Sequence, residues 1–309
     1  MPRPDTGRGQ TLLGKNEGVR ATLIVNPFAS SVTEERVREV ELELGAAYEL
    51  DTVLTERRGH AIELARAADT ETIFAFGGDG VFNEVLNGVG GDRRLGFVPG
   101  GGTNVLPRAL GLPRDPIAAA RALRTARERR ISLGRVNGRR FAFGSGIGLD
   151  SAAVRRVDAM GRGADGRRPG DSAFARAIFG IVASQGWRLP DVLEVKGAGR
   201  AALIVVAKDA VFTYAGATAL RFTPDASFER GLDYAALSSP NAIRIARGFA
   251  RALRGRGLTT TRGALSGHDL DRIEVVCDRP LPLQADGEDL GDVEEAVFEC
   301  ERDAVSVLV

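Results

Sequence analysis

The stretch from Thr72 to Val89, which reads TIFAFGGDGVFNEVLNGV, constrains the fold of this chain more than any other. Residues 73–76 are apolar on both faces, as expected for a strand that is covered on both sides in a parallel sheet. Valines then recur every four residues at positions 81, 85 and 89, which is a helical spacing. The stretch therefore predicts a strand, a glycine loop and a helix, the repeating pattern of α/β proteins.

The loop Gly77-Gly78-Asp79-Gly80 is suited to holding a phosphate. Glycines let backbone N–H groups approach the anion closely, and the start of the following helix adds a partial positive charge. Asp79 by itself would repel a phosphate, so we interpret it as a residue that holds Mg²⁺, directly or through water, as phosphoryl transfer requires. Taken alone, the four residues are equally compatible with a tight turn that closes a strand.

A second glycine-rich loop follows about 20 residues later, in a βαβα pattern. Residues 95–98 predict another buried strand, which runs into 99–104 (PGGGTN) and then into a helix over 106–110. Two such loops should face the same crevice at one edge of the sheet. Their pairing favours a cleft for nucleotide phosphates over two independent turns.

The residues before this region predict two more units of the same sheet. Residues 21–26 read as a first strand that ends at Asn26, and the carboxyl ends of parallel strands are where ligands collect. Ser31 and Glu34 form a capping-box pattern, which predicts a helix that begins there. Residues 48–54 predict the next strand.

Thr55 closes that strand, and a helix opens at residues 59–61 (GHA). His60 is a candidate catalytic residue, although a lone histidine at a helix start more often has a structural role. A further helix is predicted over 116–129.

Beyond Ile131 the pattern changes to the alternation of antiparallel strands. Residues 131–136 and 140–143 flank Asn137-Gly138, which predicts a β-hairpin. Helices are expected over 151–158 and 172–187. Strand 192–195 is expected to pair with 203–206 around a turn at 197–199.

The composition excludes several classes of protein. Of 309 residues, 42 are Lys or Arg and 41 are Asp or Glu, so the net charge of +1 provides no general attraction for nucleic acid. Cys277 and Cys300 lie in apolar runs without the spacing of a metal site, so we interpret them as reduced core thiols and the location as cytoplasmic. Residues 1–18 form a flexible lead without a hydrophobic leader, and no apolar run reaches the ~18 residues of a membrane span.

Together these segments resemble the soluble bacterial lipid kinases of the diacylglycerol kinase catalytic-domain family, whose relatives include sphingosine and ceramide kinases. Order and spacing over most of the chain are more specific than any single motif. The matching residues are Val25-Asn26-Pro27, Thr55, Gly59-His60-Ala61, Gly77-Gly78-Asp79-Gly80, Asn83-Glu84, Pro99-Gly100-Gly101, Asn104, Arg108-Ala109-Leu110-Gly111-Leu112-Pro113 and Asp286-Gly287-Glu288.

The resemblance implies an α/β N-terminal domain with a parallel sheet, like that of NAD kinases and phosphofructokinases, and a C-terminal, mainly antiparallel β-sandwich. Because the last residues of the family's chains return to the first domain, the expected domains are 19–130 with 301–309, and 131–300. It further implies that ATP binds between the domains. The implied activity is the ATP- and Mg²⁺-dependent transfer of the γ-phosphoryl group to a lipid hydroxyl. The first acceptor to expect is diacylglycerol, which would give phosphatidic acid.

The late acids are expected to do the proton chemistry. The apolar residues 281–283 predict a strand that presents Asp286 and Glu288 at its end. We expect Glu288 to be the base because its side chain is longer, with Asp286 orienting it or a metal-bound water, and Asp79 completing the catalytic set as the metal ligand. The residues expected to contact the nucleotide are Asn26, Thr55, Gly77, Gly78, Asp79, Gly80, Asn83, Gly101, Gly102, Thr103 and Asn104.

The chain departs from the family's pattern in two places. Gly102 lacks the hydroxyl common at that position and Val105 replaces an acid, which leaves Thr103 as a candidate substitute. Several bacterial members hold a structural Mg²⁺ in a segment that corresponds to residues 224–232 here. Arg230 stands where a ligand acid would be, and a guanidinium cannot bind a cation, so we predict no tightly held Mg²⁺ in this segment.

Other functions remain open. A sphingoid- or ceramide-type lipid kinase and an NAD kinase-like enzyme are alternatives, and a catalytically silent lipid- or nucleotide-binding regulator is a different class. The acceptor lipid must be reached at a membrane surface, so the protein is expected to be peripheral to the membrane. Arg244, Arg247, Arg251 and Arg254 form a helical stripe that predicts reversible binding to anionic membranes, the alternative being an ordinary solvated helix face. A homodimer is compatible with the sequence.

Overall fold

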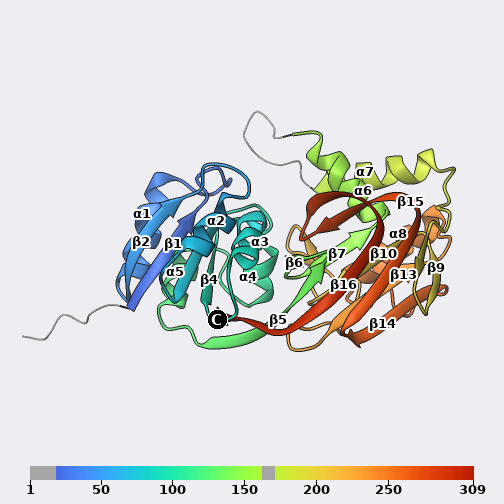
Figure 1. The fold of residues 1–309 in the computed structure, drawn as a ribbon. Helices are drawn as coiled ribbons and strands as arrows, with labels where there is room; N and C mark the ends of the chain where they lie inside the picture. The colour runs from blue at the N-terminus through green and yellow to red at the C-terminus, as the bar shows by residue number, and fades with distance from the viewer. Residues whose placement is uncertain (1–18, 162–170) are drawn as a thin grey trace, which may run out of the picture.

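The computed structural model describes residues 19–161 and 171–309, which form two lobes (Figure 1). The flexible lead expected for residues 1–18 lies outside the described residues. The first lobe is built on parallel strands in the order β4, β3, β1, β2. These strands are β1 (Val19–Val25), β2 (Tyr48–Leu54), β3 (Thr72–Gly77) and β4 (Arg94–Pro99).

Five helices complete the first lobe. α1 packs against α5, and α2 packs against α3. Every residue of β3 is buried, as its continuous apolar run predicts. The helices are α1 (Glu34–Gly45), α2 (His60–Ala67), α3 (Asp79–Gly88), α4 (Val105–Ala109) and α5 (Pro116–Leu123).

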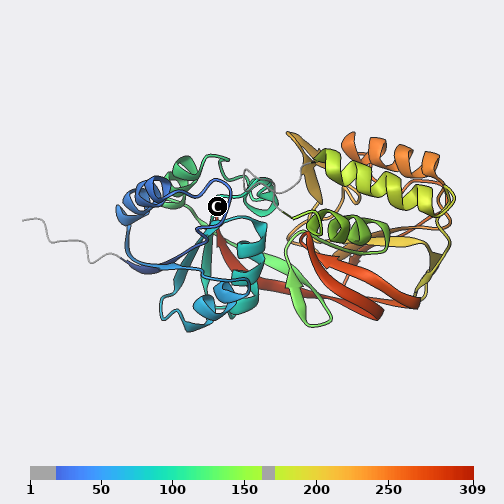
Figure 2. The same ribbon diagram turned by 90° about the horizontal axis from the view of Figure 1, so that it is seen from above.

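The second lobe is mainly antiparallel, so the predicted fold class is confirmed. Its strands are β5 (Glu128–Val136), β6 (Arg139–Phe141), β7 (Gly144–Ile147), β8 (Leu193–Val195), β9 (Gly199–Ala201), β10 (Leu203–Ala207), β11 (Thr213–Ala215), β12 (Thr218–Leu220), β13 (Leu232–Leu237), β14 (Ala264–Leu270), β15 (Arg272–Ala285) and β16 (Glu288–Leu308). Its helices α6 (Leu149–Asp158), α7 (Asp171–Ser184) and α8 (Ala242–Leu253) lie together over one side of the strands (Figure 2).

The two lobes share one sheet of 14 strands. The first part of β16 pairs with β15 in the second lobe, and its end pairs with β5 and, in parallel, with β4. Val305, Val307 and Leu308 accordingly belong to the core of the first lobe. Because of this pairing, we propose two domains as expected from the sequence: a first domain of residues 19–130 and 301–309, and a second domain of residues 131–300.

Three local predictions are wrong. The cap of α1 is Thr33, whose hydroxyl accepts from the Arg36 N–H at 3.2 Å. Ser31 lies before the helix, where its N–H donates to the Gly100 carbonyl of the second glycine loop. Helix α5 ends at Leu123 rather than at 129, since the following residues form β5 against the end of β16.

The third error concerns strand pairing in the second lobe. β8 pairs with β9 and β15, whereas β10 lies between β7 and β13. All five residues of β10 are buried, and a strand of this kind takes a central position in a sheet. The predicted hairpin is confirmed: β5 and β6 flank Asn137 and Gly138, both with positive φ.

Candidate active site

The two glycine loops lie in contact at the carboxyl ends of β3 and β4. A Cβ atom built on Gly101 would stand 2.7 Å from the Cα of Gly78, so a side chain there would force the loops apart. The Gly100 N–H also donates to the Gly77 carbonyl at 2.6 Å. The two loops therefore lie together at one edge of the sheet, as predicted, and glycine is required because the two backbones touch.

Asn104 shapes the second loop. Its side-chain oxygen accepts from the Gly101 N–H at 2.9 Å, and its amide nitrogen donates to the Gly101 carbonyl at 2.7 Å. Both ends of the amide are thus engaged within the loop. Gly102 has no neighbouring atom within 4 Å of a built Cβ, and Thr103 is exposed, so these two positions leave the loop open on one side.

Asp79 is the first residue of α3 and points at the start of α4. Its Oδ1 accepts from the Leu106 N–H at 3.2 Å. Burial raises the pKa of Asp79 to about 7, with the N–H groups of α4 opposing the rise and the neighbouring charge of Asp286 adding to it. A cation beside this carboxyl would favour its ionised form, so the residue is suited to binding a metal that arrives with a ligand.

Asp286 is buried and joins the two lobes. It accepts hydrogen bonds from the N–H groups of Ala142 (2.7 Å), Phe143 (3.0 Å) and Gly144 (3.2 Å) and from Nδ2 of Asn83 (2.9 Å). Burial raises the pKa of this carboxyl, while the four donors favour its charge. With four donors, Asp286 is suited to fixing the turn before Glu288 rather than to accepting a proton.

Glu288 lies against the first glycine loop. A Cβ built on Gly80 would stand 2.9 Å from its Oε1. Its other oxygen accepts from Nη2 of Arg139 at 2.9 Å, and Arg58 lies 3.5 Å from Oε1. The side chain of Glu288 is 13% exposed, so the carboxylate is mostly shielded from solvent.

Comparison with known proteins finds similarity in the region that carries the two glycine loops. Residues 20–136 match the model of the diacylglycerol kinase catalytic domain. The diacylglycerol kinase of Bacillus subtilis (strain 168) is 38% identical over 131 residues, which is 40% of this chain and 43% of that protein. That of Staphylococcus haemolyticus (strain JCSC1435) is 36% identical over 129 residues, or 39% of each chain.

The matched segment spans about two fifths of the length of these diacylglycerol kinases. Solved structures extend the likeness in fold to nearly the whole chain. A diacylglycerol kinase from Bacillus anthracis str. Sterne matches with a TM-score of 0.69 at 19% identity, covering 95% of this chain and 98% of that one. An NAD kinase from Archaeoglobus fulgidus in complex with ATP matches with a TM-score of 0.50 at 13% identity, covering 94% and 93%. At such identities the likeness concerns the fold alone.

The remaining residues expected at the site divide into two groups. Asn26 and Thr55 follow β1 and β2 at the edge that carries the glycine loops, and the Asn26 amide oxygen accepts from the Phe28 N–H at 2.9 Å. Asn83 lies away from the loops, buried at the junction of the lobes. It donates to Asp286 and to the Arg140 carbonyl and accepts from Arg139 at 2.7 Å, so its side chain is fully used within the protein.

Two residues of the family's pattern have local structural roles. Glu84 accepts from the N–H groups of Gly59 (2.8 Å) and Ala61 (3.1 Å), which caps the start of α2. Nδ1 of His60 accepts from the Glu56 N–H at 3.1 Å. This bond supports the structural reading of His60 over the catalytic one.

Sequence reasoning missed Arg139, which bonds both Asn83 and Glu288. Its Nε is buried without a hydrogen-bond partner among the residues that the structure describes. Because Arg139 follows an Asn-Gly turn, the sequence marks it only as a hairpin residue. Arg108 was also missed as a contact between lobes: its guanidinium carbon lies 3.2 Å from the ring centroid of Tyr214 on β11.

A narrow apolar hollow lies under the three helices of the second lobe, with Asp150 as the only acid in its lining. Asp150 accepts from Nε2 of Gln284 at 3.0 Å, and Oε1 of Gln284 accepts from the Gly287 N–H at 2.9 Å. These two bonds connect the hollow to the turn that carries Glu288. Apolar residues lining it include Leu149, Ile178, Val205, Phe222, Ile245 and Phe249.

The pH dependence of stability provides a test of this burial. Burial raises the pKa of Asp150 to about 6, so between about pH 4 and 6 the folded protein holds this proton and the unfolded chain has lost it. The contribution of Asp150 to stability therefore falls as pH rises through this window, by up to about 1.4 kcal/mol per pH unit. We expect Asp150→Asn to remove this slope in urea unfolding measured from pH 4.5 to 7.5.

The matched control is Asp92→Asn, which changes an exposed acid. Stability profiles of wild type and Asp150→Asn that run parallel across this range would contradict the prediction.

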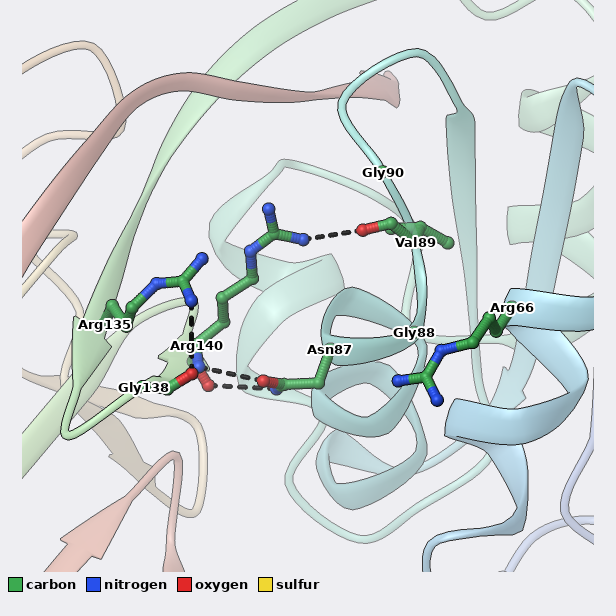
Figure 3. A pocket seen from close by; sticks show the side chains of 8 residues that line it. All are labelled: Arg66, Asn87, Gly88, Val89, Gly90, Arg135, Gly138 and Arg140. Atoms are coloured by element: carbon green, nitrogen blue, oxygen red, sulfur yellow. Dashed lines mark hydrogen bonds between the residues drawn. The ribbon is translucent and has the colours of Figure 1, made fainter.

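A larger hollow of about 320 Å³ lies at the other end of α3 from Asp79, and Figure 3 shows the side chains that line it. Glu301 binds both Arg135 and Arg140, and Nη1 of Arg140 donates to the carbonyls of Leu86 (2.9 Å) and Val89 (2.7 Å). These bonds hold the β5–β6 hairpin against the end of α3. This hollow is therefore part of the junction between the lobes and is separate from the glycine loops.

Proposed function

We propose that the protein is an ATP- and Mg²⁺-dependent lipid kinase that transfers the γ-phosphoryl group to the hydroxyl of diacylglycerol, giving phosphatidic acid. The observation that carries this proposal is the position of the Glu288 carboxylate, which lies against Gly80 in the first glycine loop. An acid beside a phosphate loop can take the proton of an alcohol that attacks the phosphorus. The family of residues 20–136 supports the same chemistry.

The residues present fit a nucleotide with its metal. Gly78 and Gly101 are in contact and carry no side chains, so the backbone of both loops is accessible to the close approach that phosphates require. No cluster of three or more acid, His or Cys side chains that could hold a metal occurs within residues 19–161 and 171–309. A metal at Asp79 would share its oxygen ligands with the phosphates, as Mg²⁺ commonly does. When bound, Mg²⁺ would offset the charge that develops on the transferred group.

The chain's own residues have separate tasks in this reaction. Asp286 fixes the turn, and Arg139 holds the Glu288 carboxylate at the glycine loop. Glu288 accepts the proton of the lipid hydroxyl while the oxygen of that hydroxyl bonds to the γ-phosphorus. The bond from that phosphorus to the bridging oxygen breaks, and ADP leaves. A base in this position contributes typically about 10²–10⁴-fold to the rate.

The apolar hollow supports a lipid acceptor over a dinucleotide. Its hydrogen-bonded connection through Asp150 and Gln284 ends at Gly287, next to Glu288. The hollow holds only about 40 Å³, so it must widen to admit an acyl chain.

A transfer assay with γ-labelled ATP tests the activity and its acceptor. Diacylglycerol, monoacylglycerol, sphingosine, ceramide and NAD are compared at equal concentration, with and without Mg²⁺. We expect the label to enter phosphatidic acid fastest and only with Mg²⁺. Transfer to NAD alone would instead identify an NAD kinase-like enzyme, and nucleotide binding without transfer would identify a silent regulator.

The acceptor also requires contact with a membrane surface. Among the residues that the structure describes, no helix is long and apolar enough to cross a membrane. The four arginines of α8 are not equivalent: Arg244 donates to the Ser238 carbonyl at 3.1 Å, and Arg251 donates to that of Gly257 at 3.2 Å. Arg247 and Arg254 are the exposed members of the stripe, although Arg254 also donates to the Ala250 carbonyl at 3.2 Å. Ile243 on the same helix is 62% exposed. The membrane contact of a peripheral, cytoplasmic enzyme is therefore assigned to this pair.

Reversing the charge of both Arg247 and Arg254 to Glu is expected to weaken binding to anionic vesicles by about tenfold or more, since each Arg contributes about 1 kcal/mol near such a surface. Co-sedimentation with vesicles of anionic lipid at low and high salt measures this. Arg38→Glu on α1 is the control, because Arg38 is as exposed but lies in the other lobe. If the double variant and the control bind vesicles equally, the stripe is an ordinary solvated helix face.

A further inference from the structure

Lys208 directly follows β10 and is completely buried. Its ammonium nitrogen donates to three backbone carbonyls, those of Ser227 (2.8 Å), Arg230 (2.6 Å) and Gly231 (3.2 Å). An ammonium has three N–H groups and no acceptor, so these three oxygens satisfy it completely. A buried charge without such partners would be strongly destabilising.

The three carbonyls belong to one loop, which leads into β13. Carbonyl oxygens that converge on one point form a site for a cation. This loop falls within residues 224–232, the segment in which the resemblance to bacterial lipid kinases implied a structural Mg²⁺.

The side chain of Arg230 does not decide whether a metal could bind in this loop, contrary to the reason given from the sequence. The Arg230 guanidinium points away from the loop's centre, with Nη1 2.9 Å from Nε2 of His268. Nδ1 of His268 in turn lies 2.7 Å from Asp233. Only the carbonyl of Arg230 faces the cation position, so the identity of its side chain does not decide what binds there.

A divalent metal does not fit beside the lysine. The Lys208 nitrogen occupies the point on which the carbonyls converge, at distances of 2.6–3.2 Å, whereas Mg²⁺ needs oxygens at about 2.0–2.1 Å. Burial lowers the pKa of Lys208, and the nearby charges of Asp209, Asp233 and Glu229 oppose this shift.

We propose that the Lys208 ammonium is a built-in structural cation of the second lobe, which replaces a metal ion and fastens the loop by which this lobe grips the first. The same loop carries Phe228, whose ring is buried in the core of the first lobe, and Glu229, which forms an ion pair with Arg129 of the first lobe.

The Lys208 backbone also reaches the candidate active site. Its N–H donates to the Phe143 carbonyl at 3.0 Å, and the Phe143 N–H holds Asp286. Loss of the ammonium should therefore loosen both the contact between the lobes and the turn before Glu288.

Thermal unfolding without nucleotide or lipid tests the proposal independently of any kinase activity. Wild type should unfold at the same temperature in EDTA and in millimolar Mg²⁺. Lys208→Met keeps the apolar stem but removes the charge, and should lower the midpoint by at least about 5 °C. Lys196→Met is the matched control, because Lys196 is half exposed and its ion pair with Glu194 is long, at 3.7 Å.

Chemical rescue keeps the test decisive if Lys208→Met does not fold. Lys208→Ala should regain thermal stability, or refold, in butylammonium but not in equal butanol, since only the former restores an ammonium. A wild-type midpoint that rises with Mg²⁺ in the absence of nucleotide would overturn the proposal. Equal midpoints for Lys208→Met and Lys196→Met, or equal rescue by butanol, would do so as well.

Discussion

Asp79→Asn is expected to lower phosphoryl transfer at least about a hundredfold, because it removes the carboxylate that we assign to the metal. Loss of charge stabilisation at a transferring phosphoryl group costs several kcal/mol of the barrier. The oxygen of asparagine can still accept from the Leu106 N–H, so the fold should persist. Initial rates at saturating ATP and Mg²⁺ measure the effect.

Two controls accompany Asp79→Asn. Asp92→Asn, a change at an exposed acid, should leave turnover unchanged. Equal unfolding temperatures of wild type and Asp79→Asn would show that the loss is chemical. If Asp79→Asn keeps more than about a tenth of wild-type turnover, Asp79 does not organise the metal.

Glu288→Gln is expected to lower turnover by about 10² or more while ATP affinity stays nearly unchanged. Glutamine can still accept from Arg139, but it cannot take the proton of the lipid hydroxyl. Separate measurement of kcat and of the Kd for ATP distinguishes a loss in the transition state from a loss of binding. Glu294→Gln, an exposed change on the same strand, is the matched control.

Asp286→Asn should behave differently from Glu288→Gln. An amide nitrogen in place of a carboxylate oxygen would face the N–H groups of Ala142, Phe143 or Gly144, so this variant should lose stability as well as turnover. Near-wild-type turnover of Glu288→Gln would move the base elsewhere, with Asp79 acting through a water as the next candidate.

The parts of this site that were predictable are those with local sequence signals. The run from Thr72 to Val89 carries its own strand, loop and helix pattern, and Asn137-Gly138 carries its own turn, so both were found where the structure has them. The contact of the two loops followed from the rule that parallel strands end at one edge.

The parts that were missed depend on pairing between distant segments. Helix α5 was predicted too long because nothing near residues 124–129 announces the strand partner at the end of β16. Ser31 was predicted to cap α1 from its local pattern with Glu34. Its actual bond, to the Gly100 carbonyl, joins segments that are distant in the sequence and so could not be predicted. Lys208 was missed for a further reason: its three partners are backbone carbonyls, which leave no trace in the identity of the side chains.

The central claim is that Glu288 and Asp79 meet the γ-phosphate at the paired glycine loops. A crystal structure with Mg²⁺ and a non-hydrolysable ATP analogue tests it most directly. We predict that the γ-phosphate lies between residues 77–80 and the Glu288 carboxylate, with Mg²⁺ bound to Asp79 directly or through a water. Binding of the nucleotide in the hollow between Arg66 and Arg140, or a metal out of reach of Asp79, would contradict it.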